Sequence, residues 1–301
     1  MDTQKVSERM KKIAYYPGCS LEKTACEYEW STRAVCEALG IELVEIPNWT
    51  CCGSTPSNAY DPLLGGALAG RNLAIAENEL GLDTVMTPCP SCLKSLKGAV
   101  KTYQKNPQAF LKILDMPFSG KVRPISVLQL LYEEVGVEAI REKVVHPLTD
   151  RVIVPYYGCL ITRPPEFADF DDPENPVSMD ALLEAIGATV PYFTHKTECC
   201  GASFGVTEKP VVGKLTGRIL EAARQAGAEA ITLACQMCQQ NLDLRQGQVN
   251  RYCNTAFNIP VVYITQLIGH ALGISHKKLG MDKLIVNAEG LFKTRASSVS
   301  A

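Results

Sequence analysis

Ten of the thirteen cysteines in this 301-residue chain fall into two sets that share one order and similar spacing. Each set has a single cysteine, then an adjacent Cys-Cys pair followed by glycine, and then a Cys-x-x-Cys pair. The first set is Cys19, Cys51, Cys52, Cys89 and Cys92, and the second is Cys159, Cys199, Cys200, Cys235 and Cys238. Thiolates bind soft metal ions and iron–sulfur clusters. The repeated pattern therefore predicts two equivalent metal centres in one chain.

A disulfide framework does not fit these cysteines. Their total is odd, the chain is not small, and its N-terminal segment is polar rather than the apolar stretch of a secretory signal. Clustered cysteines in a reducing compartment are more often metal ligands or catalytic thiols. Zinc needs only four ligands, so five cysteines per set, two of them adjacent, favour a cluster of several irons. A zinc ion in at least one set is the alternative.

Small residues and one proline around the cysteines support this interpretation. A backbone that passes close to a cluster has no room for a Cβ atom and can need a positive φ, which explains Gly18, Gly53, Gly158 and Gly201. Pro90 follows the first cysteine of its Cys-x-x-Cys pair and suits the first turn of a helix. The positive end of a helix lowers the pKa of nearby thiols, so we expect both Cys-x-x-Cys pairs at helix N-termini.

Residues outside the pattern carry weaker indications. His195 lies four residues before Cys199 and is the best candidate among the four histidines for a catalytic side chain, the alternative being a surface or strand histidine. The other three cysteines are expected to be core thiols. They are Cys26, Cys36 and Cys253. Four aromatic residues beside the cysteine groups are expected to shield the centres from water or to contact a substrate: Tyr16, Trp49, Tyr157 and Phe204.

The two halves of the chain also repeat their expected secondary structure. Each begins with a short apolar strand that ends at Gly-Cys, continues with a helix that ends near glycine, and has a second strand leading to Cys-Cys-Gly. A further helix and strand then lead to Cys-x-x-Cys. The expected strands with clear bounds are 12–16, 84–87, 152–156 and 230–233, and the helices are 28–39, 66–79, 179–186 and 211–226. Alternating strands and helices predict a parallel sheet in each half.

These elements predict an α/β fold made of two homologous modules related by internal duplication. Each module has a small parallel sheet, and every cysteine group follows a strand, at the C-terminal edge where such sheets bind ligands. We expect the first cluster-binding module over residues 1–149, the second over 150–275, and a C-terminal extension over 276–301. The formal charge of −2 gives no support for nucleic-acid binding. The chain has no run of 18 apolar residues, so we expect no transmembrane segment and a cytoplasmic protein.

The doubled pattern, with its Tyr-Pro-Gly-Cys and Cys-Cys-Gly segments, resembles the cysteine-rich CCG domain of the heterodisulfide reductase B-subunit (HdrB) family over about residues 12–275. The resemblance implies two non-cubane [4Fe-4S] clusters. Each would be held by all five cysteines of its set. It also implies an oxidoreductase acting on sulfur groups, which splits a disulfide between the clusters.

The same resemblance implies partners. Electrons would arrive from a ferredoxin-like subunit of the HdrC type, fed by a flavin-containing subunit of the HdrA type. The substrate would be a small disulfide or thiol, either the mixed disulfide of coenzymes M and B or a lipoyl-carrier or other sulfur compound. The alternative function is a non-catalytic electron-transfer subunit of a glycolate or lactate oxidase or of a succinate dehydrogenase-type complex. A structural metal-binding scaffold is a third possibility.

Overall fold

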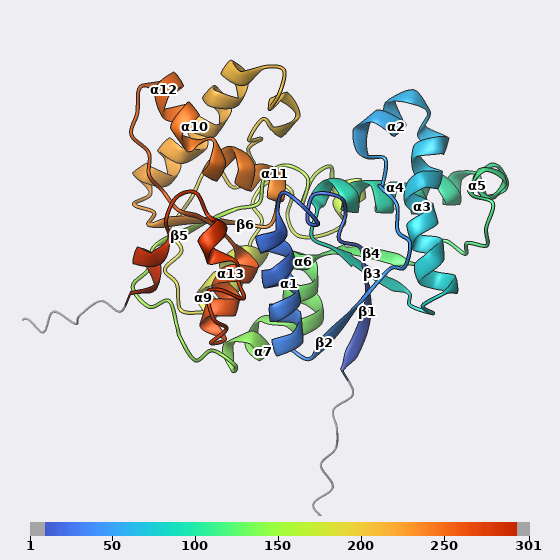
Figure 1. Ribbon diagram of the computed structural model, residues 1–301, viewed down its shortest axis with the longest axis horizontal. Coiled ribbons are helices and arrows are strands. Elements are labelled where there is room, and N and C mark those ends of the chain that lie inside the picture. Colours follow the sequence, from blue (N-terminus) through green and yellow to red (C-terminus); the bar gives the residue numbers. More distant parts are fainter. Residues whose placement is uncertain (1–9, 294–301) are drawn as a thin grey trace, which may run out of the picture.

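The computed structural model describes residues 10–293 of the chain. The outer parts of the expected first module and of the C-terminal extension, residues 1–9 and 294–301, therefore lie outside the described residues. Two parallel sheets stand side by side, with helices between and around them (Figure 1). The expected α/β fold with two small parallel sheets is confirmed.

The first sheet has four parallel strands in the order β2-β1-β3-β4. Its strands are β1 (Lys11–Tyr15), β2 (Ile41–Glu45), β3 (Thr84–Thr87) and β4 (Arg123–Ser126). The helices of this half are α1 (Cys26–Ala38), α2 (Ser54–Tyr60), α3 (Pro62–Asn78), α4 (Pro90–Lys105), α5 (Pro107–Leu114), α6 (Val127–Gln129), the π-helical turn η1 (Leu130–Val135) and α7 (Val137–Arg141).

The second sheet has three parallel strands in the order β5-β6-β7. Its strands are β5 (Ile153–Tyr156), β6 (Ala230–Leu233) and β7 (Val261–Tyr263). The helices are α8 (Pro165–Ala168), α9 (Ser178–Ala185), η2 (Ala202–Phe204), α10 (Lys209–Gln225), α11 (Gln236–Gln239), η3 (Gln240–Leu244), α12 (Gln246–Cys253), α13 (Ile264–Ala271), η4 (Met281–Lys283) and η5 (Glu289–Phe292). The expected strand before the second Cys-Cys-Gly is reduced to one parallel bridge between Val152 and Thr189.

Local sequence explains where the main helices begin and end. The Asp61 side chain accepts hydrogen bonds from the first turn of α3, and Pro62 occupies its first position. Both α1 and α9 end shortly before a glycine with positive φ, 80° at Gly40 and 87° at Gly187. Only glycine adopts this left-handed conformation without strain, so the chain can leave each helix and enter the next extended segment.

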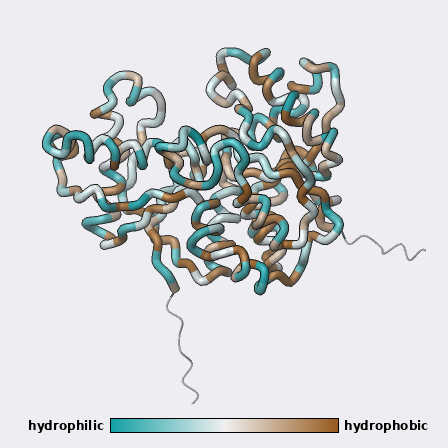
Figure 2. The backbone as a smooth tube through the Cα atoms, turned by 180° about the vertical axis from the view of Figure 1, so that it is seen from behind, coloured by the Kyte–Doolittle hydropathy of each residue, from teal (hydrophilic) through white to brown (hydrophobic). Residues whose placement is uncertain are grey.

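One continuous hydrophobic core extends through both halves, and hydrophobic segments, brown in Figure 2, lie in both. Helix α1 packs on α13, where the rings of Tyr28 and Tyr263 stack with centroids 4.0 Å apart and Ser31 Oγ lies 2.8 Å from Thr265 Oγ1. In the matching contact, α9 packs on α6 and η1. A buried aromatic pair of this kind contributes about 0.5–1.5 kcal/mol beyond its area burial. Equivalent helices therefore pair across the junction and fix the two sheets relative to each other.

The C-terminal extension packs on its own chain as far as residue 293. Gln266 Nε2 donates to the Leu279 carbonyl (3.0 Å), and the buried Asp243 carboxylate accepts from the backbone N–H groups of Ile285 and Val286. Within residues 10–293, no helix is both long enough and apolar enough to cross a membrane.

Candidate metal centre

All ten pattern cysteines line a single cavity of about 330 Å³. They reach it from the C-terminal edges of both sheets, because each cysteine group follows the end of a strand or of the short bridge. Within each adjacent pair the first cysteine is exposed and the second is buried: Cys51 and Cys52 in one module, Cys199 and Cys200 in the other. The sequence pattern predicts two thiol sets; their convergence on one cavity is a finding of the tertiary structure.

The first cysteine of each set is placed by a glycine that cannot be replaced without strain. Gly18 has a φ of 75° and Gly158 a φ of 68°. A Cβ atom added at Gly18 would lie 3.0 Å from Cys92 Sγ, and one at Gly158 would lie 3.0 Å from Cys238 Sγ. Both the conformation and the space therefore demand glycine, and the backbone can pass directly over a sulfur of the Cys-x-x-Cys pair.

The Cys-Cys-Gly turn is held in the same way in both modules. Tyr16 Oη donates to the carbonyl of Thr50 at 2.8 Å, and Tyr156 Oη donates to the carbonyl of Glu198 at 2.7 Å. Each of these carbonyls belongs to the residue just before the adjacent cysteines. The glycine that follows them has a φ of 74° at Gly53 and 80° at Gly201, as the sequence predicts. One buried tyrosine hydroxyl thus anchors each turn.

Both Cys-x-x-Cys pairs stand at the start of a helix, as expected. Cys89 is the N-cap of α4 and its sulfur accepts from the backbone N–H of Cys92 (3.4 Å), with Pro90 in the first position of the helix. Cys235 is the N-cap of α11. At Cys89 this placement satisfies an N–H group that a helix end leaves without a partner and favours negative charge on the sulfur.

Sulfur–sulfur contacts link the middle and last cysteines of each set. The Sγ atoms of Cys52 and Cys92 are 3.5 Å apart, as are those of Cys200 and Cys238. The contact with Cys92 lowers the pKa of Cys52 to about 6, and the contact with Cys238 lowers the pKa of Cys200 to about 7. The pKa values of Cys92 and Cys238 are raised. Each module is thus prepared to present thiolate, the form that binds metal.

The donor set suits an iron–sulfur cluster. Each module brings five thiols to a cavity wall that includes glycine backbone, and thiolate is the ligand of such clusters. Among residues 10–293, no group of three or more His, Cys, Asp or Glu side chains is arranged to hold a single metal ion.

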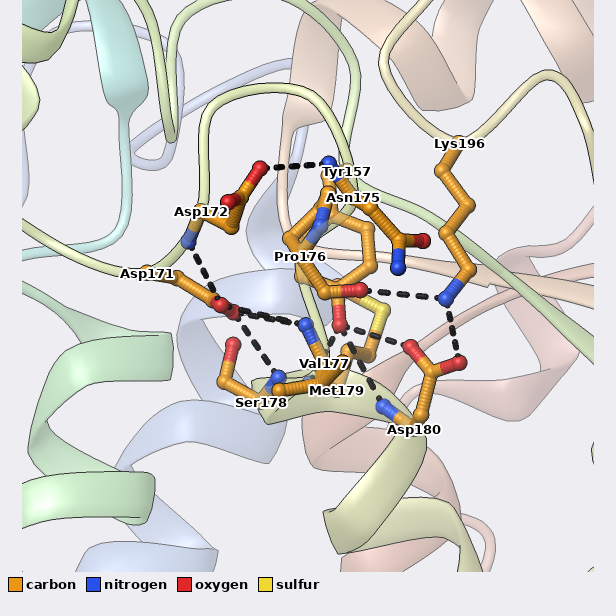
Figure 3. A network of polar contacts seen from close by, with 10 residues as sticks. All are labelled: Tyr157, Asp171, Asp172, Asn175, Pro176, Val177, Ser178, Met179, Asp180 and Lys196. Atoms are coloured by element: carbon orange, nitrogen blue, oxygen red, sulfur yellow. Dashed lines mark hydrogen bonds and ion pairs between the residues drawn. The ribbon is translucent and has the colours of Figure 1, made fainter.

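The second module has a charged network around Tyr157 (Figure 3). Tyr157, which lines the cavity, donates from Oη to Asp180 Oδ2 (2.8 Å) and accepts from the backbone N–H of Met179 (2.7 Å). Lys196 Nζ lies 2.5 Å from Asp180 Oδ1 and donates to the carbonyl of Pro176. Burial and the Asp180 charge raise the pKa of Tyr157 well above its ordinary value, so the phenol stays protonated and oriented.

Other residues singled out in the sequence lie away from the cavity. His195 is not among the lining residues, and its Nδ1 is 2.7 Å from Thr194 Oγ1. None of the three remaining cysteines lines it either, and Cys36 is buried in the core. Trp49 packs edge-on against Tyr16. Phe204 is half-exposed next to the cavity residue Ser203.

Sequence reasoning missed several residues of the cavity wall. They are Ser20, Ser54, Ser91, Leu160, Ala202, Ser203, Gln236 and Met237. Gln236 and Met237 are the two variable positions of the second Cys-x-x-Cys pair, so a closer comparison of the two motifs could have found them. Gln236 Nε2 donates to Cys89 Sγ of the other module at 2.8 Å.

A second depression adjoins the cavity and shares Ser54, Ser91 and Leu160 with it. Its volume is about 470 Å³, and α4 contributes three lysines to its wall: Lys94, Lys101 and Lys105. No ion pair to these lysines is found in the part of the chain that the structure describes. The depression therefore carries positive charge beside the thiols, and Lys101 Nζ lies 4.3 Å from the centroid of the Phe167 ring in its wall.

Comparisons with known proteins agree with this arrangement. The cysteine-rich domain family (CCG) matches twice, at residues 13–97 and 153–243. The membrane anchor subunit of the 8-methylmenaquinol:fumarate reductase of Wolinella succinogenes is 32% identical over 93% of this chain and 99% of its own length. The B subunit of the ferredoxin:CoB-CoM heterodisulfide reductase of Methanosarcina mazei is 32% identical over 94% of this chain and 97% of its own length. A protein of Archaeoglobus profundus described as like the heterodisulfide reductase B subunit is 32% identical over 90% of this chain and 93% of its own length.

A solved structure of a hypothetical protein from Helicobacter pylori shares the fold, with a TM-score of 0.72 and 13% identity over 92% of this chain and 52% of that one. The two matched cysteine-rich domains cover both thiol sets, and the named relatives align along nearly the whole chain. The chain belongs to the heterodisulfide reductase B-subunit family of iron–sulfur proteins with tandem cysteine-rich domains.

Proposed function

We propose that this protein is a catalytic subunit that carries out thiol–disulfide redox chemistry, with one non-cubane [4Fe-4S] cluster in each module. The five cysteines of each set would be the ligands of its cluster. The convergence of both sets on one cavity supports this proposal, because a disulfide entering it would meet both modules at once. When bound, the two clusters supply the two electrons that, with two protons, convert one disulfide into two thiols.

The chain's own residues would hold and enclose this reaction. The buried members of each set anchor its inner side: Cys52, Cys89 and Cys92 in the first module, and Cys200 and Cys238 in the second. Leu160 and Met237 contribute apolar surface to the wall, and Tyr157 is fixed by Asp180. An apolar wall limits the entry of water and strengthens the electrostatic interactions inside the cavity.

The lysine-lined depression suits an anionic arm of the substrate. Lys94, Lys101 and Lys105 form one face of α4, and the depression meets the cavity at Ser54 and Ser91. A carboxylate or phosphate bound there would leave the attached sulfur near the cysteines. We therefore favour a small disulfide or thiol that carries negative charge, which includes carboxylated and phosphorylated sulfur compounds.

We further propose that this subunit works in the cytoplasm within a larger complex. A ferredoxin-like subunit of the HdrC type would deliver electrons, and a flavin-containing subunit of the HdrA type would supply them. The relatives named as reductase subunits support a multi-subunit assembly. Three exposed thiols, at Cys19, Cys51 and Cys199, mark the open side of the cavity.

A non-catalytic electron-transfer subunit is the second candidate. The relative from Wolinella succinogenes, whose name describes a membrane anchor subunit of a fumarate reductase, favours it. In that role the clusters would pass electrons between partners, and the cavity would bind no sulfur compound.

Spectroscopic titration separates the two candidates. The anaerobically purified protein, with about eight irons per chain for two four-iron clusters, is titrated with a carboxylated disulfide and then with the corresponding thiol. The catalytic proposal expects a saturable change in the electron paramagnetic resonance spectrum of the clusters. If no disulfide or thiol changes any cluster spectrum, the electron-transfer function takes its place.

A double variant tests whether the lysine-lined depression binds a negatively charged substrate. Lys94→Ala together with Lys101→Ala should weaken binding of a carboxylated disulfide by up to about thirtyfold, since each of the two surface charge pairs contributes up to about 1 kcal/mol, and should leave a neutral disulfide unaffected. Lys112→Ala on α5, which is also exposed, is the matched control. Equal loss for charged and neutral disulfides would contradict a charge-specific role.

A further inference from the structure

One hydrogen bond crosses between the modules to a cysteine of the cavity. Gln236, at the first variable position of the second module's Cys-x-x-Cys pair, donates from Nε2 to the sulfur of Cys89 in the first module, at 2.8 Å. Its side chain is buried, with 1% of its surface exposed, and it lines the cavity. In residues 10–293, no other side-chain hydrogen bond joins one module to a pattern cysteine of the other.

The internal repeat shows that this bond has no counterpart at the equivalent position of the first module. Cys89 corresponds to Cys235, and Gln236 therefore corresponds to Pro90. Proline has no side-chain donor and no backbone N–H, so Pro90 cannot return the bond to Cys235. The two modules thus share a ligand pattern but differ in the number of donors that reach equivalent sulfurs.

A structural role alone does not account for the carboxamide. Gln236 Oε1 is buried and has no hydrogen-bond partner within the described part of the chain, so the bond to Cys89 is the one side-chain hydrogen bond of Gln236 there. Gln239, three residues later, is also buried, but its Nε2 donates to Asp243 Oδ2 (2.9 Å) rather than to a sulfur. Burying an amide that is only half satisfied is costly, which is tolerable where the remaining bond serves the centre.

Hydrogen bonds to a ligand sulfur favour the reduced, more negative form of a cluster and raise its reduction potential. The low dielectric of a buried site strengthens the effect. We propose that Gln236 is a positioning residue which sets the reduction potential of the first module's cluster above that of the second. The inference rests on the proposed cluster in each module and fixes the order in which the two are reduced: first module, then second.

The test is a redox titration of the anaerobic, cluster-loaded protein followed by electron paramagnetic resonance. Gln236→Leu removes the donor with little change in volume. It should lower the reduced-to-oxidised ratio of one cluster about tenfold at a fixed potential, which is ~59 mV for a one-electron couple. Gln236→Glu, which cannot donate when ionised, should shift the same cluster at least as far. Gln239→Leu is the matched control and should leave both potentials unchanged.

The identity of the shifted cluster decides the question. Gln236 is covalently part of the second module, so a merely local disturbance would change the second module's cluster. The proposal instead requires the shift in the first. Cys238→Ser and Cys92→Ser each disable one module: the Gln236→Leu shift should persist in the Cys238→Ser background and vanish in the Cys92→Ser background.

Two failures can be told apart. A protein with full iron and sulfide content whose potentials do not respond to Gln236→Leu, or whose second-module cluster responds instead, overturns this inference and leaves the proposed function standing. A protein that binds no clusters overturns the proposed function itself.

Discussion

The two modules are nearly identical where they hold thiols and different in what surrounds them. In both, a left-handed glycine leaves only 3.0 Å between an added Cβ atom and a sulfur, and a tyrosine hydroxyl anchors the residue before Cys-Cys-Gly. The residues next to these shared positions differ. Tyr157 of the second module corresponds to Pro17 of the first, and Gln236 corresponds to Pro90. The shared residues are those that position the thiols, so the differing ones are where the modules could acquire separate roles.

The surroundings differ in charge as well as in single residues. The second module has the buried Lys196–Asp180 pair tied to Tyr157, whereas the first follows its Cys-x-x-Cys pair with the long, lysine-bearing α4. The second module's α11 has only four residues before a π-helical turn. One module therefore offers a positively charged approach to the cavity, and the other offers a rigid internal network.

The largest expected effect tests whether the modules are independent centres. Cys92→Ser and Cys238→Ser should each remove about half of the bound iron and sulfide, about four irons of about eight, because each disables one ligand set. Chemical analysis of anaerobic protein measures this directly. Loss of all iron from either single variant would show that the two centres form together and would break the comparison.

The next effect concerns the shared glycines. Gly18→Ala and Gly158→Ala each place a Cβ about 3.0 Å from a sulfur at positive φ, so each should cost about 1–2 kcal/mol for the left-handed conformation alone and should reduce cluster content in its own module. Gly247→Ala, in α12 with no atom within 4 Å of the added Cβ, is the control. Unequal effects of Gly18→Ala and Gly158→Ala would mean that the two modules do not constrain this equivalent glycine to the same degree.

A smaller effect separates shared from unshared tyrosines. Tyr16→Phe and Tyr156→Phe remove equivalent hydrogen bonds and should each lower the free energy of unfolding by about 1 kcal/mol. Tyr157→Phe should cost somewhat more, about 1–3 kcal/mol, because Asp180 and the Met179 N–H each lose a partner in a buried network. Urea unfolding under anaerobic conditions gives the three free energies. A negligible cost for Tyr157→Phe would show that the network does not stabilise the second module.

The last effect is a pH dependence expected on one side of the repeat. Burial, followed by the neighbouring His276 and His146, lowers the pKa of His270 from 6.5 to about 4, and the matching residue of the first module is Glu133. Between pH 6.5 and about 4 the unfolded chain binds the extra proton, so this contribution to stability is lost as pH falls through that window. His270→Gln should flatten that part of the stability profile. An unchanged slope would exclude this histidine as its source.

Much of each module could be predicted from its own sequence. The strands at 84–87 and 230–233 have the predicted bounds, and β1 and β5 each differ from prediction by one residue at one or both ends. Gly40 and Gly187 follow their helices as predicted. These features depend on short apolar runs, glycine conformation and helix caps. Such signals act over a few residues and can therefore be recognised in the sequence. The second strand predicted for the second module differs most from the structure, where it is reduced to one bridge between Val152 and Thr189.

The sequence by itself determined which thiols belong together, since the repeat of single cysteine, Cys-Cys-Gly and Cys-x-x-Cys is a local pattern carried by local turns. Only the tertiary structure decided that both sets open on one cavity and that Gln236 reaches Cys89. The physical reason is that the relative placement of the modules comes from packing between residues far apart in the chain, such as Tyr28 on Tyr263 and Ser31 on Thr265. No spacing within either module encodes that contact.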